Sequence, residues 1–177
     1  MMESSWPSLV AGVATAFTAI LYARASLHKL FDLTAFSGFV EDYQLAPRAW
    51  SKSIAVALAL LETTIVAALV APMTRPFGLL IGAALLAVYA GAMAINIRRG
   101  RSYVECGCGG PVQPINGATL MRNGALMAMA LLGLVAPGNG LGAAEAFTVI
   151  AGGATLFIGF LLVEQMIANA SHLKTRH

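Results

Sequence analysis

Long apolar stretches separated by short polar clusters make up most of the chain. Each stretch approaches the roughly 20 residues that an α-helix needs to cross the hydrocarbon core of a bilayer. Because the membrane interior offers the backbone no hydrogen-bond partner, each stretch is expected to be helical. The pattern predicts five transmembrane helices, at about residues 8–27, 53–71, 77–97, 117–136 and 143–168.

Turn and capping residues mark the ends of these predicted helices. Pro72 and Pro76 bound one short turn, and the residues Pro137-Gly138-Asn139-Gly140 are typical of another. Asn116 is a good N-cap for the fourth helix. The longest connection, Phe31 to Lys52, mixes apolar and acidic residues, so we expect a short amphipathic helix there, lying along the membrane surface.

The composition agrees with a membrane protein. Hydrophobic residues make up 58% of the chain and charged residues 11%, whereas soluble domains are typically about 25% charged. The net charge of +3 does not indicate nucleic-acid binding, because the few Lys and Arg residues lie at the ends of apolar stretches. The sequence therefore predicts an all-α protein in which residues 1–177 form a single integral membrane domain.

We expect four of the helices to form a bundle with the fifth at its periphery. Small residues recur at a spacing of four, as in Gly12 with Ala16 and Gly78 with Gly82. Such pairs allow neighbouring transmembrane helices to approach closely.

Both cysteines lie between the third and fourth predicted helices, in the sequence Cys106-Gly107-Cys108. A Cys-x-Cys pair can close a disulfide, but its small ring departs from relaxed disulfide geometry. A strained, exposed disulfide is an oxidant rather than a structural crosslink, and the glycines supply the necessary backbone freedom. We therefore interpret Cys106 and Cys108 as a redox-active pair; the alternatives are a loop crosslink or two free thiols.

Metal binding has weaker support in the sequence. Zinc requires four ligands, and the histidines are remote from the cysteines. Copper(I) could use the two thiolates with a methionine such as Met121, although methionines in so apolar a chain more often serve packing. We expect no metal site.

Polar side chains within the predicted helices form a second candidate site, because such groups are costly in a bilayer. Arg24 and Glu62 lie at similar depths and are expected to form an ion pair, which could be a purely structural link. Glu164 is interpreted as a lone carboxylate near the interface. The functional alternative is a polar-headed cofactor beneath the cysteine loop, held by Arg24, His28, Glu62, Asn96, Arg122 and Asn123.

The distribution of charge and the cysteines point to opposite faces of the membrane. With five spans, the Phe31 to Lys52 connection, the cysteine loop and the C-terminus share one side. Ten of the 11 Lys and Arg residues lie nearer this side, and only Arg75 lies opposite. The positive-inside rule places that side in the cytoplasm, whereas stable thiol oxidation belongs to the periplasm or another oxidising compartment.

Several motifs together carry a family resemblance. They are the run Arg24 to Asp32, then Phe36, Tyr43, Leu45 and Pro47, then Glu62, then Asn96 with Arg98 to Arg101, then Cys106 to Gly109, and finally Arg122-Asn123. In this order they resemble the methylamine-utilisation MauE family, which is related to DoxX-like membrane proteins. The departures are Leu33, where a proline is common, and Gly109-Gly110 in place of an aromatic-glycine pair.

The resemblance implies a role in maturing methylamine dehydrogenase, whose small subunit is rich in disulfides. It implies a thioredoxin-like partner of the MauD type and a four-helix core similar to vitamin K epoxide reductase, in which a cysteine pair passes electrons to a membrane quinone. The chain is then expected to be a thiol-disulfide oxidoreductase using ubiquinone or a similar quinone. By analogy, Cys106 forms the mixed disulfide with the partner and Cys108 faces the quinone.

The resemblance also implies a location. The family's substrate is periplasmic, so the protein is expected in the bacterial inner membrane with its cysteine loop in the periplasm, against the charge count. Two other classes of function are considered. One is a non-catalytic membrane anchor or assembly factor for the thioredoxin-like partner; the other is a small transporter or copper handler, which the lack of a polar lane through the helices disfavours.

Overall fold

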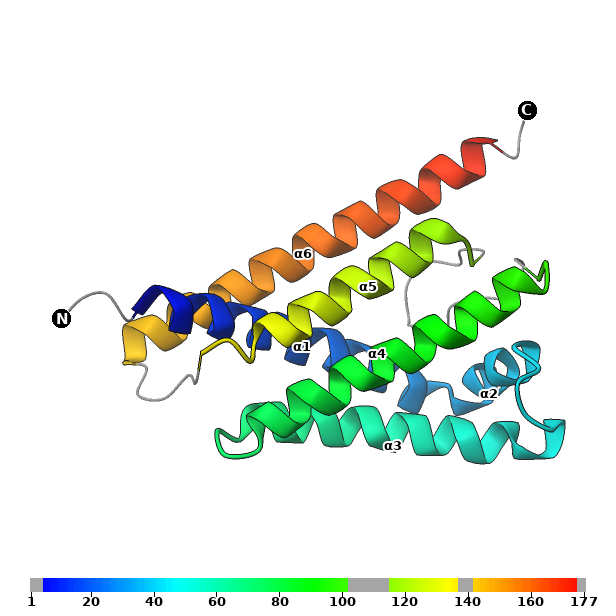
Figure 1. Ribbon diagram of the computed structural model, residues 1–177, viewed down its shortest axis with the longest axis horizontal. Coiled ribbons are helices and arrows are strands. Elements are labelled where there is room, and N and C mark those ends of the chain that lie inside the picture. The colour runs from blue at the N-terminus through cyan, green and yellow to red at the C-terminus, as the bar shows by residue number, and fades with distance from the viewer. Residues whose placement is uncertain (1–4, 102–114, 137–141, 175–177) are drawn as a thin grey trace.

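The computed structural model describes residues 5–101, 115–136 and 142–174, and within these ranges it is helical, with no β-strand (Figure 1). The chain is therefore an all-α protein, as its hydrophobic pattern predicts. A 3-10 turn, η1 (Arg48–Trp50), precedes the third helix. The α-helices are α1 (Ser5–Phe31), α2 (Leu33–Asp42), α3 (Ser51–Val70), α4 (Arg75–Arg98), α5 (Gly117–Leu132) and α6 (Ala143–Lys174).

Several of these helices are long and apolar enough to cross a membrane, so the chain is a multi-pass membrane protein. Four helical segments of the described chain meet both conditions, at Trp6–Phe31, Arg48–Val70, Arg75–Arg98 and Ala143–Met166. Helix α5 has 16 residues, fewer than the roughly 20 that a span requires, so the predicted fifth span at residues 117–136 stays a prediction.

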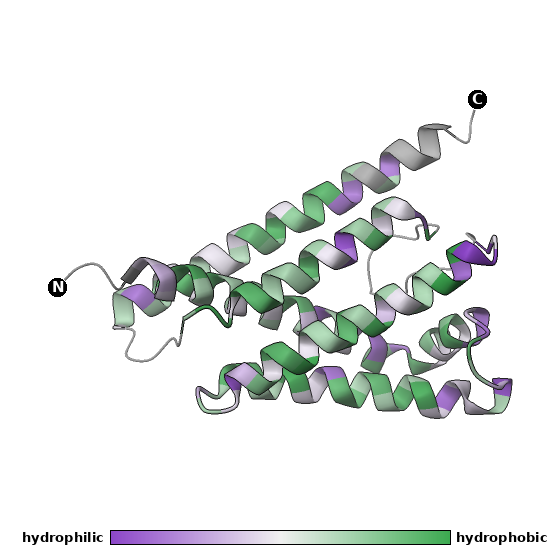
Figure 2. Ribbon diagram, in the orientation of Figure 1, coloured by the Kyte–Doolittle hydropathy of each residue, from purple (hydrophilic) through white to green (hydrophobic). Residues whose placement is uncertain are grey.

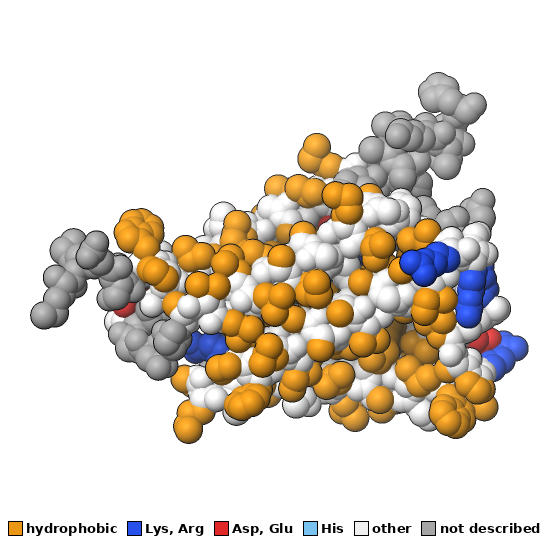
Figure 3. All heavy atoms as spheres, in the orientation of Figure 1, with side chains coloured by type: hydrophobic (Ala, Val, Ile, Leu, Met, Phe, Trp, Pro, Cys, Tyr) orange, Lys and Arg blue, Asp and Glu red, His pale blue; other side chains and the backbone are white. Residues whose placement is uncertain are grey.

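The surface agrees with a lipid environment. Figure 2 shows apolar residues along most of each helix, with hydrophilic residues mainly near the helix ends and at a few interior positions. Large hydrophobic side chains are exposed along the outside of the bundle, and Figure 3 shows them spread over most of its length. In a membrane these side chains contact lipid rather than water.

Four helices close a bundle and a fifth lies against it. Helix α1 packs against α3 and α5, and α4 packs against the same two helices. Helix α6 packs mainly along α1, outside this ring (Figure 1). The arrangement confirms the predicted bundle of four helices with one at the periphery.

The two ends of the bundle differ. Helix α2 lies at one end together with the last turns of α1 and α4, and the turn between α3 and α4 lies at the other (Figure 1). Basic side chains gather mainly at the α2 end (Figure 3). The end of α4 and the start of α5 both lie there, and they flank the segment that contains Cys106 and Cys108. These two cysteines lie outside the described residues.

Side-chain caps begin two of the helices. The Asn116 side chain accepts hydrogen bonds from the backbone N–H groups of Ala118 at 2.8 Å and Thr119 at 3.1 Å, and Thr119 Oγ1 accepts one from the Asn116 N–H at 2.8 Å. This reciprocal capping box confirms the predicted N-cap. Helix α2, capped by Asp32, is the short helix expected in the Phe31 to Lys52 connection.

Small residues lie where helices approach most closely, as predicted for Gly12, Gly78 and Gly82. The closest approach joins α6 to α1. A Cβ atom on Gly153 would lie 2.6 Å from the Ala16 Cβ and 2.9 Å from the Phe17 backbone nitrogen. Because a backbone atom cannot move aside as a flexible side chain can, this position requires glycine.

Replacing this glycine with alanine should separate α6 from the bundle. We expect Gly153→Ala to lower the thermal unfolding midpoint of the detergent-solubilised protein, with a cost of about 1–3 kcal/mol for overpacking. Gly159→Ala is the matched control on the same helix, because a Cβ there meets nothing within 4 Å, and it should leave the midpoint unchanged or slightly higher. Equal midpoints for the two variants would contradict the described packing of α6.

Candidate functional site

An ion pair is buried inside the bundle, between α1 and α3. Lys29 Nζ lies 2.7 Å from each of the two carboxylate oxygens of Glu62. The side chains are 2% and 1% exposed, respectively. Removing two charges from water costs several kcal/mol per ion, which only good geometry and further hydrogen bonds offset.

Aromatic side chains complete the surroundings of this pair. Tyr89 of α4 donates a hydrogen bond from its hydroxyl to Glu62 Oε1 at 2.7 Å. Lys29 Nζ lies 4.9 Å from the ring centroid of Phe36 on α2 and 5.7 Å from that of Tyr89. Both distances suit cation–π attraction, which is strongest where water is excluded. The pair and its neighbours therefore join α1, α2, α3 and α4 at one point.

The predicted ion pair between Arg24 and Glu62 is wrong, since Lys29 holds this carboxylate. Arg24 and Lys29 are five residues apart, so their side chains leave α1 in directions roughly 140° apart. Lysine's long stem allows Lys29, near the end of α1, to reach a carboxylate deeper in the bundle. In the sequence, Lys29 lies in the basic cluster at the end of the first apolar stretch, so its pairing with a buried carboxylate was not predicted.

Arg24 and Arg122 instead share a different carboxylate, that of Glu164. Arg24 Nη1 lies 3.8 Å from Glu164 Oε2, and Arg122 Nη1 forms a hydrogen-bonded ion pair with Glu164 Oε1. Glu164 is 4% exposed, so its interpretation as a lone interfacial carboxylate is wrong. This cluster joins α1 and α5 to α6, whereas the Lys29 pair joins α1 to α3.

Two buried asparagines fasten neighbouring segments to α4. Asn96 donates from Nδ2 to the backbone oxygens of Tyr43 and Ala92, each at 3.2 Å. Asn123 of α5 donates from Nδ2 to the Leu86 oxygen at 2.7 Å. Among the residues that the structure describes, the buried Oδ1 atoms of Asn96 and Asn123 have no hydrogen-bond partner, which is unusual for buried polar groups.

The six residues predicted to hold a cofactor therefore fall into separate sets of contacts. Glu62 binds Lys29 and Tyr89, the two arginines share Glu164, and the asparagines bind backbone oxygens. His28 is exposed. No ligand tests their cofactor role, which stays a prediction.

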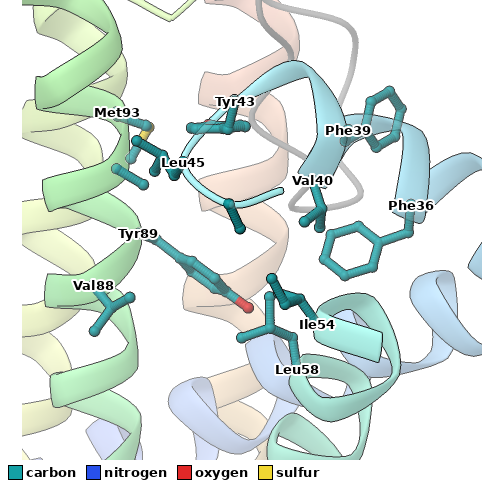
Figure 4. Close-up of a pocket in the computed structure, with 12 residues that line it drawn as sticks. Phe36, Phe39, Val40, Tyr43, Leu45, Ile54, Leu58, Val88, Tyr89 and Met93 are labelled. Carbon is teal, nitrogen blue, oxygen red and sulfur yellow. The ribbon is translucent and has the colours of Figure 1, made fainter. Parts of the chain in front are cut away.

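An apolar pocket of about 210 Å³ lies between α2, α3 and α4 (Figure 4). Its lining contains two tyrosines and otherwise side chains without oxygen or nitrogen. Figure 4 shows the Tyr89 ring extending from α4 across the pocket toward α3. The lining residues are Phe36, Phe39, Val40, Tyr43, Leu45, Ala46, Ile54, Leu58, Val88, Tyr89, Ala92 and Met93.

Some residues of the pocket lining contact the ion pair, and others contact Ile115, which follows the cysteine-containing segment. Phe36 and Tyr89, which surround Lys29, both line it. Ile115 is the first described residue after the segment that contains Cys106 and Cys108. It is fully buried and packs with Met93 and Tyr43, which also line the pocket. The sequence did not reveal this pocket, because its lining residues are apolar and come from three separate helices and a turn.

Metal binding finds no support in the part of the chain that the structure describes. There, no three or more His, Cys, Asp or Glu side chains come together in a way that could hold a metal ion.

Removing the charge of Lys29 should destabilise the protein strongly. Lys29→Met keeps most of the apolar stem but leaves Glu62 buried without its cation, at a typical cost of about 3–5 kcal/mol. Thermal unfolding of the solubilised protein should therefore shift markedly downward. Lys52→Met is the matched control, since Lys52 is exposed at the start of α3, and it should have little effect. A Lys29→Met variant as stable as the control would contradict the importance of the pair.

Comparison with known proteins adds the family. The family model described as methylamine utilisation protein MauE matches residues 7–136. Methylamine utilization protein MauE of Paracoccus denitrificans is 36% identical over 146 residues, covering 81% of this chain and 76% of the relative. The protein of the same name from Paracoccus versutus is 36% identical over 149 residues, covering 80% and 78%.

No solved structure gives a significant match, so the expected similarity to vitamin K epoxide reductase stays a prediction. The matched range contains Lys29, Glu62 and Tyr89, and also both cysteines. It covers most of the chain, and the curated relatives are similar over most of their own length. The chain therefore belongs to the methylamine utilisation protein MauE family.

Proposed function

We propose that this protein is a membrane thiol-disulfide oxidoreductase, in which Cys106 and Cys108 pass electrons from a thioredoxin-like partner to a membrane quinone. The observation that carries the proposal is the position of Ile115. This residue comes directly after the cysteine-containing segment and is buried against Met93 and Tyr43 of the pocket lining. A redox-competent cysteine pair and a pocket suited to a lipid-soluble ring are thus joined by a short length of chain.

The electron balance requires one partner on each side of the cysteine pair. The chain has two cysteines, so it holds one disulfide at most and cannot relay electrons through a second. A thiolate of the partner attacks the Cys106–Cys108 disulfide, and exchange leaves the partner oxidised and this pair reduced. Re-forming the disulfide releases two electrons and two protons, which reduce the quinone to a quinol. In this scheme Cys106 receives the partner's thiolate and Cys108, nearer α5, faces the quinone.

The pocket fits the ring of a quinone. Its volume of about 210 Å³ exceeds that of an apolar cavity of about 150 Å³ that holds benzene in another protein. Figure 3 shows a hollow on the visible face between α3 and α4, bordered by hydrophobic side chains. Phe36, Tyr89 and Met93 would contact the ring, and the quinone would supply the two-electron acceptor that the chain lacks.

The relatives' names connect the proposed reaction to methylamine utilisation. We propose that the disulfide reaches the small subunit of methylamine dehydrogenase through a thioredoxin-like partner of the MauD type. In this proposal α5 and residues 133–136 make the fifth span. The cysteine segment then faces the periplasm of the bacterial inner membrane, where disulfides persist.

Internal ion pairs reduce the conflict between this orientation and the positive-inside rule. Lys29 is paired with Glu62, while Glu164 is shared by Arg24 and Arg122. In this proposal Lys29 and Arg122, whose charges lie in ion pairs inside the protein, serve packing, so we leave these two out of the count of Lys and Arg that the positive-inside rule compares.

Thiol labelling in whole cells tests both the chemistry and the orientation. A membrane-impermeant maleimide should label few thiols in untreated cells and should label both after a thiol reductant, without lysis. A variant with both cysteines changed to serine is the control for other labelled groups. Labelling only after lysis would rule out the periplasmic orientation. Thiols that stay reduced whether or not the partner is present would favour a non-catalytic anchor.

The single variants extend the same experiment to the two cysteine roles. Cys108→Ser should accumulate a mixed disulfide between Cys106 and the partner, formed when the Cys106 thiolate attacks the disulfide of the oxidised partner, because Cys108 is not there to resolve it. Cys106→Ser should not accumulate this adduct. Non-reducing gel electrophoresis of acid-quenched cells measures the adduct. An adduct on Cys106→Ser alone would reverse the assigned roles.

A further inference from the structure

The hydroxyl of Tyr89 lies between the buried ion pair and the apolar pocket. It donates to Glu62 Oε1 at 2.7 Å, and the same side chain lines the pocket (Figure 4). Ten of the twelve lining side chains carry neither oxygen nor nitrogen. A ligand with a polar oxygen therefore has few side-chain groups to recognise it there, and Tyr89 is the one held by a charged pair.

Glu62 does not depend on Tyr89 for its hydrogen bonds. Lys29 Nζ lies 2.7 Å from both carboxylate oxygens, so Oε1 accepts from Lys29 and from Tyr89 at once. An ammonium carries three donors, and a carboxylate accepts up to about four hydrogen bonds. If the Tyr89 hydrogen turned away, Glu62 would keep its ion pair and no buried acceptor would be left unsatisfied.

We propose that Tyr89 is the hydrogen-bonding contact for an oxygen of the ring in the pocket, and that Lys29 and Glu62 position it. Glu62 fixes the tyrosine while the pocket is empty, and Lys29 makes the tyrosine's hydrogen available when a ligand arrives. This inference rests on the proposed function for the class of ligand, a quinone, and adds the residue that recognises it.

A phenolic hydroxyl suits both redox forms of such a ligand. A tyrosine can donate one hydrogen bond and can also accept. Toward a carbonyl oxygen, Tyr89 donates by turning its hydrogen away from Glu62. Toward a ring hydroxyl, Tyr89 keeps its hydrogen on Glu62 and accepts instead. The same side chain therefore holds the oxidised and the reduced ring without moving the ion pair.

Binding of decylubiquinone to the purified full-length protein in detergent tests this role. We expect Tyr89→Phe to raise the dissociation constant about fivefold, the loss of one neutral hydrogen bond. The infrared carbonyl stretch of the bound quinone should lie below its free value in the natural protein and move back toward that value in Tyr89→Phe. The alkylbenzene decylbenzene, which has no ring oxygen, should bind both proteins equally, because the pocket keeps its shape.

Tyr22→Phe is the matched control, since it removes another buried tyrosine hydroxyl. The Tyr22 hydroxyl donates a hydrogen bond of 2.6 Å to the Gly82 oxygen, and Tyr22 is not among the residues that line the pocket. The Tyr22→Phe variant should leave quinone affinity and the carbonyl stretch unchanged. Failure of the natural protein to bind decylubiquinone would overturn the inference. So would a Tyr89→Phe variant with unaltered affinity and carbonyl frequency.

The outcome for Tyr89 can be distinguished from the outcome for the proposed oxidoreductase function. Redox cycling of Cys106 and Cys108 in cells, together with unaltered binding by Tyr89→Phe, would refute only the role of Tyr89. Tyr89-dependent binding by a protein whose cysteines never cycle would refute the oxidoreductase and leave the ring site in place.

Discussion

A charge buried in a membrane protein must be balanced within the protein, because neither lipid nor water is there to do so. Lys29 and Glu62 meet this requirement with two short contacts and the hydroxyl of Tyr89. Since the participating residues come from three bundle helices, with Phe36 of α2 beside them, these elements cannot shift independently without exposing a charge to apolar surroundings. The arrangement of helices at the α2 end of the bundle therefore depends on this ion pair.

The apolar pocket owes its shape to the same interactions. Helix α2 is short, and it is held over the bundle by Phe36 against Lys29 and by the Asn96 amide, which binds the Tyr43 backbone oxygen. The space left between α2, α3 and α4 is lined by carbon on nearly all sides and has a charged pair directly behind one wall. Such a place suits a lipid-soluble ring with polar oxygens, and Ile115 joins it to the cysteine segment.

The length of the apolar stretches and the capping chemistry predicted the helices well. The apolar stretches, the Asn116 cap and the small residues at helix contacts follow from local sequence, and each is present. The partners of buried charges were harder to predict, because they depend on the direction in which each side chain leaves its helix. Arg24 was matched with Glu62 on depth alone, whereas Lys29 reaches that carboxylate and Glu164 holds both arginines. The pocket could not be predicted from the sequence, because apolar residues that face a cavity are of the same types as those that face lipid or a core.

In the proposed function, the cysteine pair exchanges electrons with a quinone bound by this chain. The most direct test mixes purified protein, with Cys106 and Cys108 reduced and excess reductant removed, with decylubiquinone under anaerobic conditions. The ultraviolet absorbance of the quinone should fall by one equivalent per protein as the disulfide forms, and Cys106→Ser should give no change. A protein that binds the quinone but leaves both the quinone and the reduced thiols unaltered would contradict this electron transfer.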